Sequence, residues 1–191
     1  MKTKIIILLM AGSIFLVINC LNAQETRAGI KGGLNSATLT GYTGNSRISG
    51  HAGVFVHNVI NNRWCFQPEL LFSGEGQRYF GDGEKRTIAL DYIQLPLMIQ
   101  YFPIRQLYLE AGPQVGILAS ARDKGSNGLA INIKNDFSNA QVGMNIGVGV
   151  KANNSIGFYG RYCFGLTDVS TFDNIVDHSR VGQVGLSIRL K

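Results

Sequence analysis

The sequence predicts an all-β protein that forms an eight-stranded antiparallel up-and-down transmembrane β-barrel. Apolar and polar residues alternate along eight segments, which is the period of a β-strand with two different faces. The connections between these segments are alternately short and long. Outer-membrane barrels have this arrangement, with short turns in the periplasm and long loops outside. The short turns are expected at 61–62, 103–105 and 153–154, and the long loops near 40–47, 79–87, 122–136 and 171–179.

Each strand is assigned from this alternation, and the last is the clearest. Val184, Leu186 and Ile188 share one face, whereas the residues between them are polar or glycine. The segment 137–152 repeats the pattern, with apolar residues at every second position from Val142 to Val150. In chain order we expect strands at 26–39, 47–60, 63–78, 88–102, 106–121, 137–152, 155–170 and 179–190.

The apolar face of these strands is expected to contact lipid. A soluble barrel would instead place its apolar face inside. The segments are long enough to cross a bilayer on a tilt, and the polar face is rich in glycine with isolated charges, which suits a narrow, filled lumen. Aromatic residues also gather at strand ends, as in the interfacial girdles of membrane barrels. They are Trp64, Phe66, Tyr101 and Phe102 near the short turns, and Tyr79, Phe80 and Tyr92 near the long loops.

Composition and the first residues favour an exported protein. Hydrophobic residues make up 45% of the chain and charged residues 16%, with a net charge of +6. No run of Lys and Arg interleaved with aromatic residues is present, so nucleic-acid binding has no support. Residues 1–23 combine a basic start, an apolar core and Ala23 before the expected cut, which predicts a signal peptide. Residues 24–191 then form the barrel domain.

Prolines and cysteines add two further expectations. Pro68, Pro96 and Pro113 fall inside predicted strands, and we expect a β-bulge or local bend at each because a closed barrel has no free edge. Cys65 lies beside a short turn and Cys163 in the middle of its strand, so the two should be too far apart for a disulfide. Two free thiols are therefore predicted.

Five short motifs resemble the PorT-like outer-membrane β-barrel family of Bacteroidetes-type bacteria. They occur in order along nearly all of the mature chain, at 29–35, 66–73, 92–97, 109–113 and 162–168. The resemblance implies a small outer-membrane barrel, and most members of the family have no assigned activity. Its namesake is linked to protein secretion across the outer membrane, a role that fold alone does not transfer. The chain departs from many such barrels in ending with Arg189-Leu190-Lys191 instead of an aromatic residue.

A polar network is predicted inside the barrel. An eight-stranded barrel is just wide enough to be filled by side chains or to hold one small ligand. Glu69 and Glu110 can pair there with Lys31, Arg161 or Arg189, because unpaired charges in such a site are costly. We expect a structural plug of ion pairs and amides, with a polar conduit or ligand pocket as the alternative. The predicted network is Lys31, Glu69, Glu110, Gln114, Arg161 and Arg189.

Other polar residues give only weak indications of a metal site or a catalytic site. His51 and His57 lie about 20 Å apart along one strand at roughly 3.3 Å per residue, too far to share a metal. His178 beside Asp173 and Asp177 is expected to be a solvated loop residue rather than a cation site. Ser49 with His51, and Ser120 with Asp123, lie near strand tops, yet no nucleophile motif frames either serine. No cofactor and no metal are expected.

The sequence therefore favours a non-enzymatic outer membrane protein whose surface loops bind a partner or support envelope organisation or protein secretion. Its expected partners are outer membrane lipid, the barrel-insertion machinery and a surface or periplasmic protein, and we expect a monomer. The alternatives are a small-solute channel or ligand-binding barrel, and a lipid-modifying enzyme active at the rim through His51 or Ser49.

Overall fold

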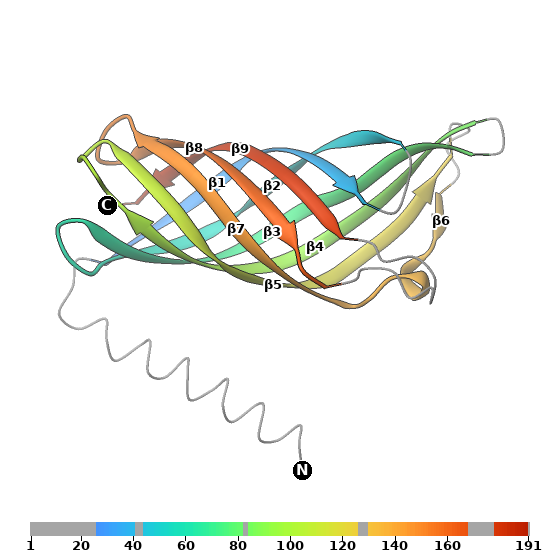
Figure 1. Ribbon diagram of the computed structural model, residues 1–191, viewed down its shortest axis with the longest axis horizontal. Coiled ribbons are helices and arrows are strands. Elements are labelled where there is room, and N and C mark those ends of the chain that lie inside the picture. Colours follow the sequence, from blue (N-terminus) through green and yellow to red (C-terminus); the bar gives the residue numbers. More distant parts are fainter. Residues whose placement is uncertain (1–25, 41–43, 82–83, 126–129, 168–177, 191) are drawn as a thin grey trace, which may run out of the picture.

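The computed structural model describes residues 26–40, 44–81, 84–125, 130–167 and 178–190. They form one antiparallel sheet that closes into a ring of eight strands, as predicted (Figure 1). The predicted signal peptide, residues 1–23, lies outside these ranges. The strands of the ring are β1 (Thr26–Leu39), β2 (Asn45–Val59), β3 (Trp64–Gly81), β4 (Glu84–Tyr101), β5 (Leu107–Lys124), β7 (Ala140–Lys151), β8 (Ile156–Gly165) and β9 (Ser179–Arg189).

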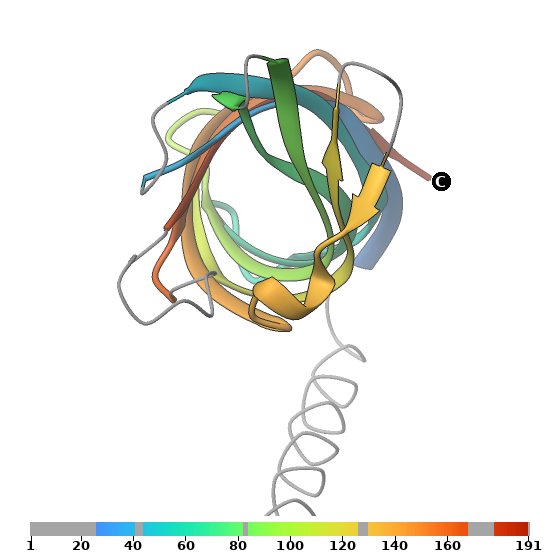
Figure 2. The ribbon, with the colours of Figure 1, turned by 90° about the vertical axis from the view of Figure 1, so that its right-hand side faces the viewer.

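Pairing between the first and last strands closes the ring. β1 pairs with β2 on one side and with β9 on the other, where Gly33 lies opposite Gly185 (Figure 2). Closure matters because a strand edge exposed to lipid would leave backbone N–H and C=O groups without partners. A ninth, short strand, β6 (Ala130–Asn132), pairs with the end of β5 beyond the ring.

The two ends of the barrel differ as the sequence indicates. The β2–β3, β4–β5 and β7–β8 turns lie at the end that holds Thr26 and Leu190, which we call the short-turn end (Figure 1). The opposite, long-loop end differs from the prediction in two places. Residues 79–81 and 84–87 are strand residues of a β3–β4 hairpin, because the two strands stay paired up to Gly81 opposite Glu84. The stretch 122–136 contains the end of β5, then β6 and a 3-10 turn, Lys134–Asp136.

The apolar face of the strands points outward, as expected for a barrel in lipid. Along β7, the apolar side chains from Val142 to Val150 are exposed, and the residues between them face the interior. Two aromatic assignments were wrong, since Tyr92 and Phe102 are buried inside the barrel. Their even-numbered positions share the inward face with Gln94 and Gln100, so the alternation outweighs the preference of aromatic rings for interfaces. Trp64 and Tyr101 stack outside, with ring centroids 4.8 Å apart.

Of the two features expected at each proline, the β-bulge was wrong, whereas the local bend stays a prediction. Pro68 lies opposite Leu97, and Pro113 lies opposite Met144, in ladders whose register continues on both sides. The register shifts instead between Ser46 and His51, and between Asp91 and Tyr92. A proline removes one donor without requiring an extra residue, so the strand passes through it with its faces unchanged.

Gly76 adopts a conformation that favours glycine. Its φ angle is 118°, and a Cβ placed there would lie 2.1 Å from the Ile88 carbonyl oxygen. The glycine thus permits β3 and β4 to stay close at the long-loop end, where they form the projecting hairpin.

A charge on the outer face of the barrel should destabilise it according to depth. Ile146 lies within β7 and is 51% exposed, whereas Ile104 lies in the β4–β5 turn and is 58% exposed. In lipid vesicles, Ile146→Arg should lower the free energy of unfolding by about 2–4 kcal/mol, and Ile104→Arg by about 0–1 kcal/mol. Urea titration followed by fluorescence of Trp64, the single tryptophan, measures both. Equal losses for the two variants would contradict the outward apolar band.

Candidate functional site

The centre of the barrel holds four charged side chains of balanced sign. Lys31 on β1 donates to both carboxylate oxygens of Glu69 on β3, at 2.9 and 3.1 Å. Arg161 on β8 also binds Glu69 and reaches across to Glu110 on β5. All four side chains are almost fully buried. Two cations and two carboxylates therefore neutralise one another, and each charge is desolvated only where an opposite charge lies against it.

Arg161 is the hub of this group. Its two terminal nitrogens donate to the two oxygens of Glu69, each at 2.9 Å, and its Nε donates to Glu110 at 2.8 Å. One planar guanidinium thereby donates hydrogen bonds to two carboxylates, a geometry that lysine cannot reproduce. Gly147 leaves the required space, because a Cβ there would lie 3.0 Å from a Glu110 oxygen and 2.7 Å from the Gly160 carbonyl oxygen.

Amide side chains complete the central group. Gln67 donates to Glu69 at 2.8 Å, and Gln100 donates to Glu110 at 3.0 Å. Gln114 lies one layer further toward the long loops, where it accepts a hydrogen bond of 3.0 Å from Asn145. The first contact lies within β3, and the other two join neighbouring strands, β4 with β5 and β5 with β7. All of these side chains point inward, so they occupy the lumen where a conduit would otherwise run.

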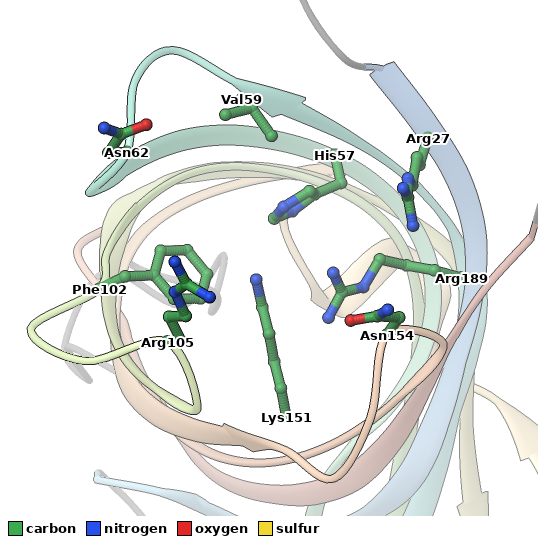
Figure 3. Close-up of a pocket in the computed structure, with 9 residues that line it drawn as sticks. All are labelled: Arg27, His57, Val59, Asn62, Phe102, Arg105, Lys151, Asn154 and Arg189. Carbon is green, nitrogen blue, oxygen red and sulfur yellow. The ribbon is translucent and has the colours of Figure 1, made fainter.

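Arg189, the sixth residue of the predicted network, lies elsewhere. It lines a cavity at the short-turn end, together with Lys151 and Arg105 (Figure 3). The pairs of Glu69 and Glu110 are made by Lys31 and Arg161 instead. Its position near the end of β9 explains the difference, since Arg189 lies opposite Gly29, two residues closer to the barrel mouth than Lys31.

A third buried carboxylate, which the sequence analysis did not single out, lies nearer the long loops. Glu75 on β3 is 1% exposed and accepts hydrogen bonds from Gln94, Gln141 and Ser179. Its position could have been inferred, because residues 67, 69, 73 and 75 alternate onto one face.

An apolar cluster closes the lumen above Glu75. Its buried members come from β1, β4, β5 and the segment after the 3-10 turn, and Tyr79 and Ile133 pack against it. In β4 the cluster residues continue the even-numbered inward face, whereas in β5 the register shift opposite Tyr92 moves the buried position to Ala121. The alternation alone could therefore have indicated most of the cluster, but not Ala121. Its buried residues are Leu39, Ile88, Leu90, Tyr92, Leu118, Ala121 and Phe137.

The residues considered for metal binding or catalysis have structural partners. His51 contacts Asn35 at 2.6 Å and the Tyr159 hydroxyl, and His57 contacts Gln67 at 3.1 Å. The Ser49 hydroxyl donates to the Gly74 carbonyl oxygen at 2.6 Å. In the described ranges of the chain, no group of three or more His, Cys, Asp or Glu is arranged to hold a metal ion.

The remaining polar candidates also lie in structural contacts. Asp123 is bound by Arg86 at 2.7 Å and by the Tyr79 hydroxyl at 2.9 Å. His178 donates its backbone N–H to Thr40, while its predicted neighbours Asp173 and Asp177 lie outside the described residues. The prediction of free thiols is confirmed, since Cys65 and Cys163 are both unbridged and buried. No helix among the described residues has the length and apolar character needed to span a bilayer.

The closed ring, its outward apolar band and its filled interior define a small outer-membrane β-barrel, which places the protein in the outer membrane. The chain belongs to the family described as the outer membrane protein beta-barrel domain, whose model matches residues 22–171. Comparison with curated proteins gives no match.

Two solved structures illustrate the shared fold, the attachment invasion locus protein Ail and Neisserial surface protein A. Ail of Yersinia pestis is 12% identical, and the match covers 87% of this chain and 99% of Ail with a TM-score of 0.54. Neisserial surface protein A is 10% identical, with 86% of this chain and 97% of that chain covered and a TM-score of 0.59. At these identities the likeness concerns the fold alone.

Replacing Arg161, the hub of the central network, should strongly destabilise the barrel. Arg161→Met leaves Glu69 and Glu110 buried with Lys31 as the single cation of the central group. The free energy of unfolding should fall by about 3–5 kcal/mol, the cost of an uncompensated buried charge. Urea unfolding in vesicles measures this loss.

The matched control restores the charge balance. Adding Glu110→Gln to Arg161→Met leaves one cation, Lys31, with one carboxylate, Glu69. The double variant should therefore be more stable than Arg161→Met alone. A double variant that is less stable than the single one would show that charge balance does not govern this site.

Proposed function

We propose that this protein is a non-enzymatic, non-conducting outer-membrane barrel that binds a protein partner at its long-loop end. The filled lumen carries this proposal. The Arg161 network, the Glu75 cluster and the apolar cluster around Leu90 follow one another along the barrel. Water and ions would have to displace paired charges and then apolar side chains to pass. Partner binding is therefore expected at the ends of the barrel rather than in its interior.

The β3–β4 hairpin offers a surface suited to a partner. A cavity of about 670 Å³ lies beside it, lined by Arg78, Lys85, Arg86 and aromatic residues. Phe80 is 70% exposed at this site. Arginine and aromatic side chains are enriched where proteins bind one another. The surface that complements this hairpin best is an apolar patch surrounded by acidic side chains, because the hairpin presents cations around aromatic rings.

The five PorT-like motifs support a role in envelope organisation or protein secretion. They span strands β1, β3, β4, β5 and β8, including Glu69 and Glu110 of the central network. Such a role would depend on the protein contacts of the barrel, with no substrate turned over. We further propose that the chain works as a monomer, is inserted by the barrel-insertion machinery and loses residues 1–23 on export.

The proposal excludes a rim enzyme because the candidate nucleophile is engaged. The Ser49 hydroxyl donates a hydrogen bond to a backbone carbonyl oxygen. His51 faces the lumen and contacts Asn35 and Tyr159. A general base must lie within hydrogen-bond reach of the proton that it removes. The contacts of this serine and histidine instead support structural roles.

Planar-bilayer recording tests the closed lumen. Purified protein inserted into the bilayer should give no stepwise conductance, whereas a general porin measured in parallel should. Large, reproducible steps from this protein would contradict a lumen closed by the Arg161 network and the apolar cluster.

Exchange of the hairpin tests the site of partner binding. Phe80→Ser combined with Lys85→Gln should leave the heat-modifiable gel mobility of the barrel unchanged, because both side chains lie outside the ring. In a strain lacking the chromosomal copy, this variant should fail to restore the wild-type envelope integrity or secretion. Ile104→Ser, at the opposite end, is the control. Full restoration by the hairpin variant would refute this surface as the binding site.

A further inference from the structure

We propose that the short-turn mouth of the barrel is a binding site for a small, multiply charged phosphate compound. The cavity there has a volume of about 290 Å³ and is lined by residues from four strands and three turns. This site lies at the opposite end from the hairpin surface and does not depend on the proposed function.

Four cationic side chains converge on this mouth cavity. Arg27 comes from β1, Arg105 from the β4–β5 turn, Lys151 from the end of β7 and Arg189 from the end of β9. In Figure 3 the charged ends of Arg105, Lys151 and Arg189 point into the same space. None of the nine described residues that line the cavity is acidic. Like charges held around one recess create a positive potential that favours an anion.

The wall of the mouth cavity is built by the fold. Lys151 lies over the ring of Phe102, with Nζ 3.7 Å from the ring centroid. Phe102 also packs against Tyr108 and, edge-on, against His57. His57 is itself held by Gln67 on β3. Lys151 is thus held against a packed aromatic cluster, two members of which, Phe102 and His57, line the mouth cavity.

The type and number of the cations favour phosphate over a single carboxylate. A guanidinium donates two parallel hydrogen bonds to phosphate oxygens, and a lysine adds a point charge. A carboxylate presents two oxygens and one negative charge, which would match one of the four cations. A phosphomonoester carries about −1.5 to −2 charges and three acceptor oxygens, and a diphosphate carries more. The cavity volume also suits a compound of that size rather than a large ligand.

Calorimetric titration with sodium pyrophosphate tests the site. The full mature barrel is held in uncharged maltoside micelles at constant ionic strength, so that no lipid phosphate competes. We expect saturable binding of one pyrophosphate per barrel. Arg189→Gln and Arg105→Gln should each weaken it by about tenfold, since each removes a charge-assisted contact. Arg105 is exposed in a turn, so its replacement leaves the barrel able to fold.

Arg180→Gln is the matched control, because Arg180 lies on the same strand, β9, at the long-loop end. It should leave the affinity for pyrophosphate unchanged. The absence of saturable binding, or an equal loss in Arg180→Gln and Arg189→Gln, would overturn the proposal. The first result would mean that the mouth holds no phosphate, and the second that binding reflects overall charge alone.

A second arm identifies the source of the phosphate. The titration is repeated in lipid nanodiscs of phosphatidylcholine, with and without phosphatidic acid. Suppression of pyrophosphate binding by phosphatidic acid would assign the site to a lipid headgroup of the inner leaflet. Unchanged binding would assign it to a soluble phosphate compound of the periplasm. Either result supports a phosphate site, provided that Arg189→Gln weakens binding in the same discs.

Discussion

The pairing of Arg161 with Glu69 and Glu110 is the interaction on which the rest of this structure depends. An eight-stranded ring leaves an interior that side chains must fill. Here the chain fills its centre with two carboxylates, and each would be costly to bury alone. Arg161 on β8 pairs with Glu69 across the lumen and with Glu110 two strands away, and Lys31 completes the charge balance. The central group thereby ties β1, β3, β5 and β8 together across the lumen, in addition to the hydrogen bonds around the ring.

This constraint divides the barrel into layers with different chemistry. The centre is polar and neutral in sum, the long-loop end is closed by apolar side chains, and the short-turn mouth is cationic. Each layer is formed by the inward-facing residues of the strands at that level. Small residues on one strand leave space for large side chains from another. Gly149 shows this directly, because a Cβ there would lie 2.2 Å from the ring of Tyr108. With the interior occupied, the two ends are the surfaces left for recognition.

Much of this arrangement could be predicted from the sequence. Period-two alternation gave β1 its observed bounds and placed Lys31, Glu69, Glu110 and Arg161 on one inner face. The side chains of these residues were then expected to pair, because unpaired charges in a narrow lumen are costly. The same rule would have placed Tyr92 and Phe102 inside. The interfacial preference of aromatic rings was a weaker guide than the alternation.

The features that were missed depend on register and on long-range packing. The register shift opposite Tyr92 changes which residues of β5 face inward, and this places Ala121 in the apolar cluster. The length of the β3–β4 hairpin depends on pairing up to Gly81, which a polar, glycine-rich stretch does not reveal. Arg189 was placed on the correct strand and near the interior, but its height relative to Glu69 follows from the stagger between β9 and β3. One chain's alternation carries no information about that stagger.

The reactivity of Cys163 measures most directly whether the lumen is closed. This thiol is buried, lies two residues from Arg161 on the inward face of β8 and packs against Ala37 and Val181. In a Cys65→Ser background, a charged, water-soluble thiol reagent should leave Cys163 unmodified in the folded barrel and modify it rapidly after unfolding in urea. Rapid modification of Cys163 in the folded barrel would contradict a lumen filled and closed by paired side chains.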